Sequence, residues 1–376
     1  MHLTRRSLLS LVSALAAGMG SGFAYAAEEP LVGPIKLIGG RVAMAVTIND
    51  VQTFMFAIDT GGATSLINET VAHDLGLPSA GYVDVGIFGQ SGPRRLFETK
   101  SINYAGIFRQ KHAGFVGVPG EPLGDGLAGS LDCGILTTFF CELDYEALEW
   151  KVWPRTRPTL SGYSRLDAEI TSPQPGLSPF IVSSARVNGS KRRLLLDTGS
   201  ESFVRLNHDV AQELGLWSDQ WPYAPFRGGA RITRIDSLDF GGSDFQRPLA
   251  LLLTDNREST ISDGLIGLPT LRRFNLVCDP TNSAVWGLRN NLPAPAEHYP
   301  LSGLWVDTSG TSMKVAVVGT GSPAQKSGMK IGDVILNKDA PTLFQQLAGS
   351  QGSLITLEIA RRDQRSMISF TLEPYL

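Results

Sequence analysis

The stretch FMFAIDTGGATSLI, residues 54–67, ends an apolar run with a carboxylate. Asp59 directly follows the apolar residues 54–58, and Thr60, Gly61 and Gly62 follow it. An isolated ionised carboxylate is costly to bury, so Asp59 needs a partner charge, a shared proton or a dense set of donors. The stretch therefore predicts a buried acidic site whose partner lies elsewhere in the chain.

An internal repeat supplies that partner. Residues 194–204 read LLLDTGSESFV, so a second Asp-Thr-Gly begins at Asp197, 138 residues after Asp59. One such triplet arises readily by chance, but two copies within the same order of flanking blocks indicate a duplication. We therefore predict two similar lobes in a two-fold arrangement that brings the two turns together. The flanking blocks are the turns at Asn49 and Asn188, VAHDLGL (71–77) and VAQELGL (210–216), SINYAG (101–106) and SLDFGG (237–242), and DGLAGSLDCG (125–134) and DGLIGLPTL (263–271).

The composition favours β structure. Gly accounts for 41 of the 376 residues, and short runs rich in Val, Ile, Leu and Thr are separated by turn residues. A chain of this length also exceeds what one hydrophobic core usually organises. We expect a mainly β protein with an export signal at 1–26, a first lobe at 27–162, a second lobe at 163–295 and a small α+β domain at 296–376.

A pair of facing carboxylates gives the two turns a chemical role. Two carboxylates at about 3 Å cannot both ionise, so the pair would hold one proton between them. The ionised member can then take a proton from a bound water while the protonated member polarises a peptide carbonyl. Asp59 and Asp197 are the candidate catalytic residues of a hydrolase that needs no cofactor. The predicted supporting residues, which turn the backbone sharply or bridge the lobes, are Thr60, Gly61, Thr198, Gly199 and Ser200.

These motifs resemble the aspartic proteases of retroviral and pepsin type. The resemblance covers both lobes and includes the apolar-apolar-Gly strands at 127–129 and 265–267. It implies two pseudo-symmetric acid-protease β-barrel lobes, each like one retroviral-type subunit but fused in one chain. It also implies endopeptidase activity on extended peptides, with a glycine-rich hairpin flap over the substrate. The candidate flaps are Phe88, Gly89, Gln90, Ser91 and Gly92 in the first lobe, and Arg227, Gly228, Gly229, Ala230 and Arg231 in the second.

The two turns differ at the position after the triplet. Gly62 offers no side chain, whereas Ser200 has a hydroxyl that can donate to the outer oxygen of Asp197. Because a donor stabilises the ionised form, we predict that Asp197 is more often the ionised member and Asp59 the protonated one.

The C-terminal segment follows a proline-rich linker, NLPAPAEHYPLSG (291–303). The stretch GSPAQKSGMKIGDVIL (321–336) resembles the PDZ domain of bacterial proteases, which implies peptide binding by addition to a sheet edge. Trp305 stands where the family's loop has its second glycine, so capture of a free C-terminus, binding of an internal segment and packing against the lobes all stay open. The predicted peptide-binding residues are Gly303, Leu304, Trp305 and Val306.

The N-terminal 26 residues predict an export signal. They have a basic start, an apolar stretch and Ala24-Tyr25-Ala26 at the end, and Arg5-Arg6 resembles the twin-arginine motif. We expect an exported, periplasmic bacterial protein; an ordinary secretory signal is the alternative to the twin-arginine route. Cleavage would remove Arg5 and Arg6 and no acid, so the net charge would fall from −3 to −5, and nucleic acid is not an expected partner.

Metal binding and membrane spanning are poorly supported. No pair among Cys133, Cys141 and Cys278 has CxxC spacing, and the five histidines are scattered. One disulfide among the three cysteines is permitted in an oxidising compartment, with the pairing open. No later stretch approaches 18 consecutive apolar residues, so we expect no membrane span in the mature chain.

Two functions fit these patterns. The first is an exported aspartic endopeptidase whose PDZ domain recruits or regulates. The second is a catalytically silent peptide-binding or scaffold protein that uses the protease-like cleft. A serine hydrolase is disfavoured because the chain lacks a G-x-S-x-G elbow.

Overall fold

The computed structural model describes residues 29–87, 90–172, 177–256, 261–308, 312–362 and 364–376. The predicted signal at 1–26 and Phe88 and Gly89 of the first candidate flap lie outside these ranges. The chain divides into two units: the first holds residues up to 185, 193–201 and 265–294, and the second holds 186–192, 202–264 and 295–376. This division follows packing, whereas the predicted lobes follow the sequence repeat.

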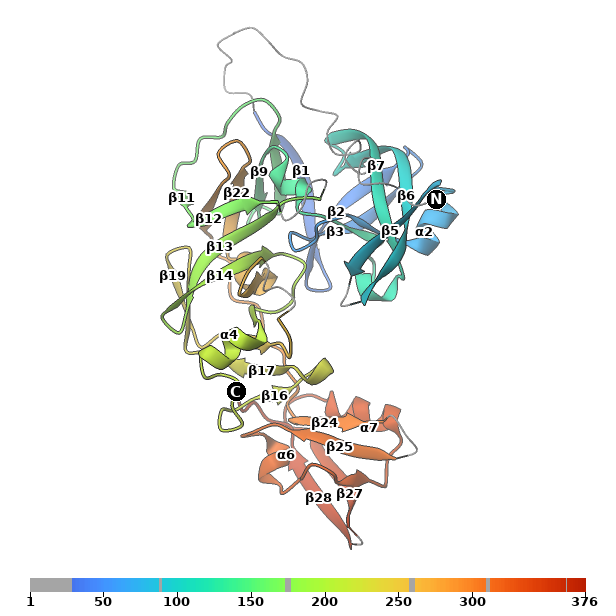
Figure 1. The fold of residues 1–376 in the computed structure, drawn as a ribbon, viewed down its shortest axis with the longest axis vertical. Helices are drawn as coiled ribbons and strands as arrows, with labels where there is room; N and C mark the ends of the chain where they lie inside the picture. Colours follow the sequence, from blue (N-terminus) through green and yellow to red (C-terminus); the bar gives the residue numbers. More distant parts are fainter. Residues whose placement is uncertain (1–28, 88–89, 173–176, 257–260, 309–311, 363) are drawn as a thin grey trace. The chain divides into compact units, whose positions relative to one another are not determined.

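Strands dominate the first unit (Figure 1), which confirms the mainly β expectation. Thirteen strands form one sheet in the order β11-β23-β22-β9-β10-β1-β2-β3-β8-β4-β7-β6-β5. They are β1 (Leu31–Ile38), β2 (Arg41–Ile48), β3 (Gln52–Ile58), β4 (Leu66–Asn68), β5 (Ser79–Ile87), β6 (Gln90–Tyr104), β7 (Phe108–Val118), β8 (Gly129–Leu131), β9 (Phe140–Asp144), β10 (Glu149–Trp153), β11 (Ser164–Arg165), β22 (Phe274–Asp279) and β23 (Ala284–Arg289). The unit also contains β12 (Ala168–Thr171), which pairs with β13, and the short helices α2 (Glu69–Asp74), η1 (Glu121–Leu123), α3 (Gly134–Thr137) and α5 (Leu268–Leu271).

β3, the strand that leads into Asp59, pairs with β8. β3 and β8 are parallel, with Phe56 opposite Gly129 and Ile58 opposite Leu131. A Cβ on Gly129 would lie 2.2 Å from the carbonyl oxygen of Leu66, so only glycine allows this approach. β3 therefore ends in a fixed position, with Asp59 as the next residue.

The two repeats meet in the first unit through β9 and β22. These strands are antiparallel, and Cys141 lies opposite Cys278. The side-chain amide of Asn275 on β22 donates to Asp144 on β9 at 2.9 Å, and Lys151 reaches the same carboxylate at 2.7 Å. The three cysteines, all within the described residues, are buried and form no disulfide.

The second unit holds most of the second repeat. Its elements are β15 (Val204–Leu206), α4 (His208–Glu213), β16 (Ala224–Pro225), η2 (Arg227–Gly229), β17 (Arg231–Arg234), β18 (Ser237–Phe240), β19 (Ser243–Gln246) and β20 (Leu249–Leu252). Three strands continue across the division between the units: β13 (Phe180–Val187), β14 (Ser190–Asp197) and β21 (Gly264–Gly267).

The same side chain organises the first turn of both repeats. The Asn49 amide oxygen accepts from the backbone N–H groups of Lys100 and Ser101 at 2.7 and 3.2 Å. The Asn188 amide oxygen accepts from Asp236 and Ser237 at 2.8 and 3.2 Å. Asn49 and Asn188 are thus structural equivalents, and each ties its hairpin turn to the block that the sequence repeats as SINYAG and SLDFGG.

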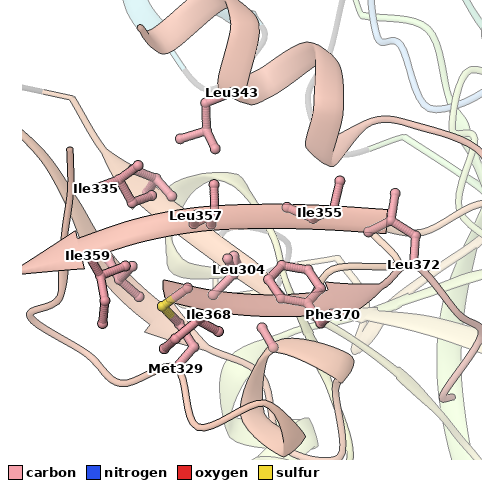
Figure 2. Close-up of a cluster of buried hydrophobic side chains, with 13 residues drawn as sticks. Leu304, Met329, Ile335, Leu343, Ile355, Leu357, Ile359, Ile368, Phe370 and Leu372 are labelled. Carbon is pink, nitrogen blue, oxygen red and sulfur yellow. The ribbon is translucent and has the colours of Figure 1, made fainter. Parts of the chain in front are cut away.

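The C-terminal domain has its own sheet and core within the second unit. Five strands pair in the order β24-β25-β26-β27-β28. Figure 2 shows the core, in which Leu343 from the helix faces Leu357 and Ile355 on the sheet. Ser322 and Asp339 cap the two helices by accepting from backbone N–H groups. The elements are β24 (Leu304–Asp307), β25 (Met313–Val318), α6 (Pro323–Lys326), β26 (Val334–Ile335), α7 (Ala340–Leu347), β27 (Leu354–Arg361) and β28 (Gln364–Thr371).

Candidate active site

Asp59 and Asp197 occupy matching positions at the ends of β3 and β14. The N–H of Asp59 donates to the carbonyl of Leu131 at 2.8 Å, and the Asp59 carbonyl accepts from Gly62 at 3.1 Å. The Asp197 carbonyl accepts from the N–H of Ser200 at 3.3 Å. Each carboxylate therefore projects from a tight turn that its own backbone closes.

The structure brings the two carboxyl groups together, and they share a hydrogen bond. A Cβ on Gly61 would lie 2.4 Å from the carboxyl carbon of Asp197, and a Cβ on Gly199 would lie 2.4 Å from Oδ1 of Asp59. Each glycine N–H donates to the aspartate of its own turn, at 3.1 Å for Asp59 and 2.8 Å for Asp197. Each carboxyl group thus packs directly over the glycine of the opposite turn.

The two threonines lock the turns to each other. Thr60 Oγ1 donates to the carbonyl of Leu196 at 2.6 Å and accepts from the N–H of Thr198 at 2.9 Å. Thr198 Oγ1 donates to the carbonyl of Ile58 at 2.6 Å and accepts from the N–H of Thr60 at 3.1 Å. Both side chains are fully buried. These four bonds fix the separation of the two strand ends, and with it the separation of the carboxylates.

Burial makes ionisation of Asp59 costly. The pKa of Asp59 is raised to about 8: desolvation contributes most, the neighbouring charge of Asp197 and the hydrogen bond to it add to the rise, and Arg41 and the N–H of Gly61 oppose it. Burial therefore favours the protonated form of Asp59. Which of the two aspartates is more often ionised stays a prediction.

Gly62 and Ser200, the residues that follow the two triplets, have different contacts. Ser200 is buried, and its carbonyl accepts from the N–H of Leu268 at 2.9 Å. A Cβ on Gly62 would lie 3.6 Å from Oδ2 of Asp59 and 3.3 Å from the carbonyl oxygen of Asp59, so the second contact is tight. Donation from the Ser200 hydroxyl to Asp197 stays a prediction.

The first candidate flap belongs to a long hairpin. β5 and β6 pair from Ser79 and Phe97 to Ile87 and Gln90, so Gln90, Ser91 and Gly92 begin the returning strand next to the predicted tip. Ile87, Val85 and Val83 from β5 join an apolar cluster with Leu123 and Leu127. The hairpin thus has an apolar inner face in the unit that contains both aspartates.

The second candidate flap is much shorter and belongs to the second unit. Arg227, Gly228 and Gly229 form η2 between β16 and β17, which share two residue pairs. Gly228 and Gly229 adopt φ values of 66° and 79°, which favour glycine. Arg231 stacks over the ring of Tyr223 at 4.1 Å and pairs with Asp219 at 2.7 Å.

Two groups of residues that sequence reasoning missed support the catalytic turns. Asp132 accepts from the hydroxyls of Ser178 and Ser65 at 2.6 and 2.9 Å, and the N–H of Ser178 donates to the carbonyl of Ala63 at 3.0 Å. Arg41 donates to the carbonyl of Gly199 at 3.3 Å. The sequence contains one signal for Asp132: the second repeat has Thr270 at the equivalent position, so the two repeats differ there.

The predicted peptide-binding loop of the C-terminal domain is closed on itself. The N–H of Leu304 donates to the hydroxyl of Ser302 at 3.2 Å, and the carbonyl of Gly303 accepts from Gly319 at 2.8 Å. Trp305 is 39% exposed, whereas Leu304 and Val306 are buried. Since the Leu304 donor is occupied, the loop is poorly prepared to hold a free carboxylate.

The same domain packs against the second repeat within the second unit. The carbonyl of Thr320 accepts from the N–H of Tyr223 at 3.3 Å, and the Tyr375 hydroxyl donates to the carbonyl of Tyr223 at 3.2 Å. β16 lies against β24. Glu297 in the linker forms two hydrogen bonds with Arg234, at 3.0 and 2.5 Å. Packing against the lobe, one of the three options for this domain, is therefore present.

The described part of the chain lacks two features, a metal-binding cluster and a membrane-spanning helix. It contains no group of three or more His, Cys, Asp or Glu side chains that could hold a metal ion. It also contains no helix that is long and apolar enough to cross a membrane.

Comparison with known proteins finds a family that matches both repeats. No curated protein sequence matches the chain. Among solved structures, a retropepsin-like aspartic protease from Rickettsia conorii is 19% identical with a TM-score of 0.26, and the match covers 33% of this chain and 90% of that chain. The family described as Aspartyl protease matches residues 44–129 and 183–270, so both Asp-Thr-Gly turns lie in segments that are similar to this family, which supports a protease-like function.

Proposed function

We propose that this protein is an aspartic endopeptidase that hydrolyses peptide bonds in extended peptide or protein substrates. The observation that carries the proposal is the buried pair of carboxyl groups, Asp59 and Asp197, which share a hydrogen bond between the ends of two repeated strands. The hydrogen bonds of Thr60 and Thr198 hold this pair, and the match of both repeats to the aspartyl protease family supports it.

The chemistry follows from one proton shared by two acids. Ionised Asp197 accepts a proton from a water molecule as the water oxygen attacks the peptide carbonyl carbon. Protonated Asp59 donates its proton to the carbonyl oxygen, so the tetrahedral intermediate is a neutral diol. Collapse of the diol breaks the C–N bond: one diol hydroxyl returns its proton to Asp59, and the proton now on Asp197 passes to the leaving nitrogen. The β5–β6 hairpin, with its apolar inner face, closes over the substrate.

Export and the C-terminal domain complete the proposal. The protein is exported to the periplasm through its N-terminal signal, and the PDZ-like domain recruits or regulates. Its sheet ends in β24, where an internal peptide segment adds by main-chain hydrogen bonds. The occupied N–H of Leu304 favours such a segment over a free C-terminus.

Digestion of a peptide library at several pH values tests the catalytic proposal. Wild type should cleave, whereas Asp59→Asn and Asp197→Asn should each lose activity by at least about 1,000-fold, because neither can complete the acid-base pair. Asp74→Asn, at an exposed position on α2, is the matched control and should cleave as wild type does. Sensitivity to pepstatin is a second readout.

The alternative function gives a different result in the same experiment. A silent peptide-binding protein would retain peptides without cleaving them, and the two Asn variants would bind as wild type does. A folded wild type that binds library peptides and releases no fragments at any pH would overturn the endopeptidase proposal.

A further inference from the structure

Arg41 lies where the first repeat reaches the second catalytic turn. It is the first residue of β2 and follows the glycine pair Gly39-Gly40, whose φ values are 54° and 77°. Its Nη1 donates to the carbonyl of Gly199 at 3.3 Å, and its Nη2 lies 3.7 Å from Oε1 of Glu201. The Arg41 side chain is 22% exposed and that of Glu201 is 65% exposed. The guanidinium is thus largely buried on the carbonyl, and solvent reaches its carboxylate partner.

The residues that make this contact are not repeated at the other turn. Counting back from the equivalent residues Asn49 and Asn188, the position of Arg41 in the second repeat is Phe180, which is buried. Counting from the two catalytic aspartates, the position of Glu201 in the first repeat is Ala63. The carbonyl of Ala63 accepts from the backbone N–H of Ser178 at 3.0 Å. The two turns are therefore contacted differently: a backbone N–H reaches the first turn at Ala63, and a cation reaches the second turn at Gly199.

The positive charge of Arg41 affects the protonation of the Asp59/Asp197 pair. Arg41 lowers the pKa of Asp59, against the larger effects of burial and of Asp197. Cys133 interacts electrostatically with Asp59 and Asp132; burial raises the pKa of the Cys133 thiol well above its usual range, so it carries no charge. Glu201 lies beyond Arg41 and offsets part of its positive charge.

We propose that Arg41 is a positioning residue of the Asp59/Asp197 site: it fixes the carbonyl of Gly199, and its charge moves the pH range in which the pair carries one proton to lower pH. Glu201 moderates that charge. The site is consequently polarised from one side although the two turns are nearly symmetric. Readouts by cleavage rest on the proposed endopeptidase function, and a second readout does not.

The pH profile of cleavage gives opposite expectations for the two partners. Arg41→Met removes a positive charge, so both limbs of the bell-shaped profile should move up by about half to one pH unit. Glu201→Gln leaves Arg41 less neutralised, so both limbs should move down. Arg41→Met should also lower kcat about 10-fold with little change in KM, since the second turn is less well held. Arg41→Lys keeps the positive charge, so both limbs should stay close to their wild-type positions. Its kcat should recover less, because lysine holds the second turn less well than arginine does.

Thermal unfolding against pH needs no substrate. The raised pKa of Asp59 means that the folded chain keeps a proton that the unfolded chain loses, so stability falls as pH rises from about 4 towards 8. Arg41→Met should extend this fall to higher pH, and Glu201→Gln should end it at lower pH. Arg109→Met, which breaks the exposed pair with Asp50, is the control and should move neither readout.

These outcomes separate the two proposals. If wild type cleaves nothing but the unfolding curves of the two variants shift in opposite directions, the endopeptidase proposal fails and the role of Arg41 stands. If wild type cleaves but Arg41→Met and Glu201→Gln leave the limbs and the unfolding curves where wild type has them, the role of Arg41 is overturned. If Arg41→Met fails to fold, Glu201→Gln alone decides, because unchanged limbs and an unchanged unfolding curve in that variant would overturn the role of Arg41.

Discussion

Gly61 and Gly199 set how closely the two carboxyl groups meet. Each carries only a hydrogen where any other residue has a Cβ, and that hydrogen faces the carboxyl group of the opposite turn. The need for glycine at these two positions is therefore steric and mutual. A side chain on either turn would displace the aspartate of the other repeat.

Alanine at either glycine should disable the site. The added Cβ would lie 2.4 Å from an atom of the opposing carboxylate, closer than real Cβ contacts allow. We expect Gly61→Ala and Gly199→Ala each to lower kcat/KM by at least about 100-fold and the free energy of unfolding by about 1–3 kcal/mol. Peptide digestion and chemical denaturation measure these effects. Gly114→Ala, whose Cβ would meet Leu96 at 3.4 Å, should change neither, and wild-type behaviour of all three would refute the steric argument.

Gly62 and Ser200 are expected to set the two limbs of the pH profile. In Gly62→Ser the new Cβ lies 3.6 Å from Oδ2 of Asp59 and 3.3 Å from the Asp59 carbonyl oxygen, which requires a small shift. The serine hydroxyl can then stabilise ionised Asp59 and lower its pKa. The alkaline limb, where the shared proton is lost, should then move down by about one pH unit. Ser200→Ala removes the predicted donor to Asp197, so the acid limb should move up. An unchanged acid limb in Ser200→Ala would show that this hydroxyl does not stabilise Asp197.

The sequence was informative about residues that the duplication repeats. Asp59 and Asp197 could be paired because the same triplet recurs, and carboxylates at such positions have a limited chemistry. Arg41 and Asp132 could not be found this way, because Phe180 and Thr270 replace them in the second repeat. Their roles depend on distances to residues far away in the sequence, which no local pattern encodes.

The elements that carry the site meet at two strand ends. β3 and β14 each finish against the threonine of the other repeat, so four hydrogen bonds link strands that are 138 residues apart in sequence. Because these bonds are buried, water cannot replace a lost partner. The geometry of the dyad should therefore depend on both threonines.

Loss of either threonine hydroxyl should loosen this junction. Thr60→Val leaves the carbonyl of Leu196 and the N–H of Thr198 unpaired, so we expect a loss of about 1–3 kcal/mol in the free energy of unfolding. Thr198→Val should cost a similar amount, and the double variant should cost less than the sum, because the two residues share their partners. Urea titration measures all three. Thr138→Val, which removes an exposed hydrogen bond to Gly134, is the control; strict additivity would contradict a shared network.

Strand order was harder to anticipate than strand content. The Asn-containing turns at Asn49 and Asn188 indicated strand–turn–strand units, and the hairpin β2–β3 formed at the first of them. The pairing of β9 with β22 joins residues from both repeats. No turn links these strands, so only the packed chain reveals that pair. The 15-residue length of β6 likewise depends on its three partners, β5, β7 and β2.

In the whole chain, the C-terminal domain is not separated from the second repeat as its proline-rich linker suggests. Glu297 and Tyr299, both in that linker, bond Arg234 and the backbone of Tyr375 and Leu376. Tyr299 also packs with Ala224, Ile232 and Leu249 of the second repeat in one apolar cluster. The composition of the linker correctly indicated irregular chain, but the contacts of Glu297 and Tyr299 make the linker part of a folded unit.

This packing predicts that the second unit unfolds cooperatively. Tyr299→Phe removes the acceptor of two backbone N–H groups, at 2.8 and 3.1 Å, and should lower stability by about 1–2 kcal/mol. Amide hydrogen exchange should then quicken both in β28 and in β16–β17, because opening the C-terminal residues uncovers the cluster around Ile232. Glu358→Gln, which breaks an exposed pair with Arg365, should leave both regions protected. Faster exchange confined to residues after 303 would mean that the C-terminal domain folds independently of the second repeat.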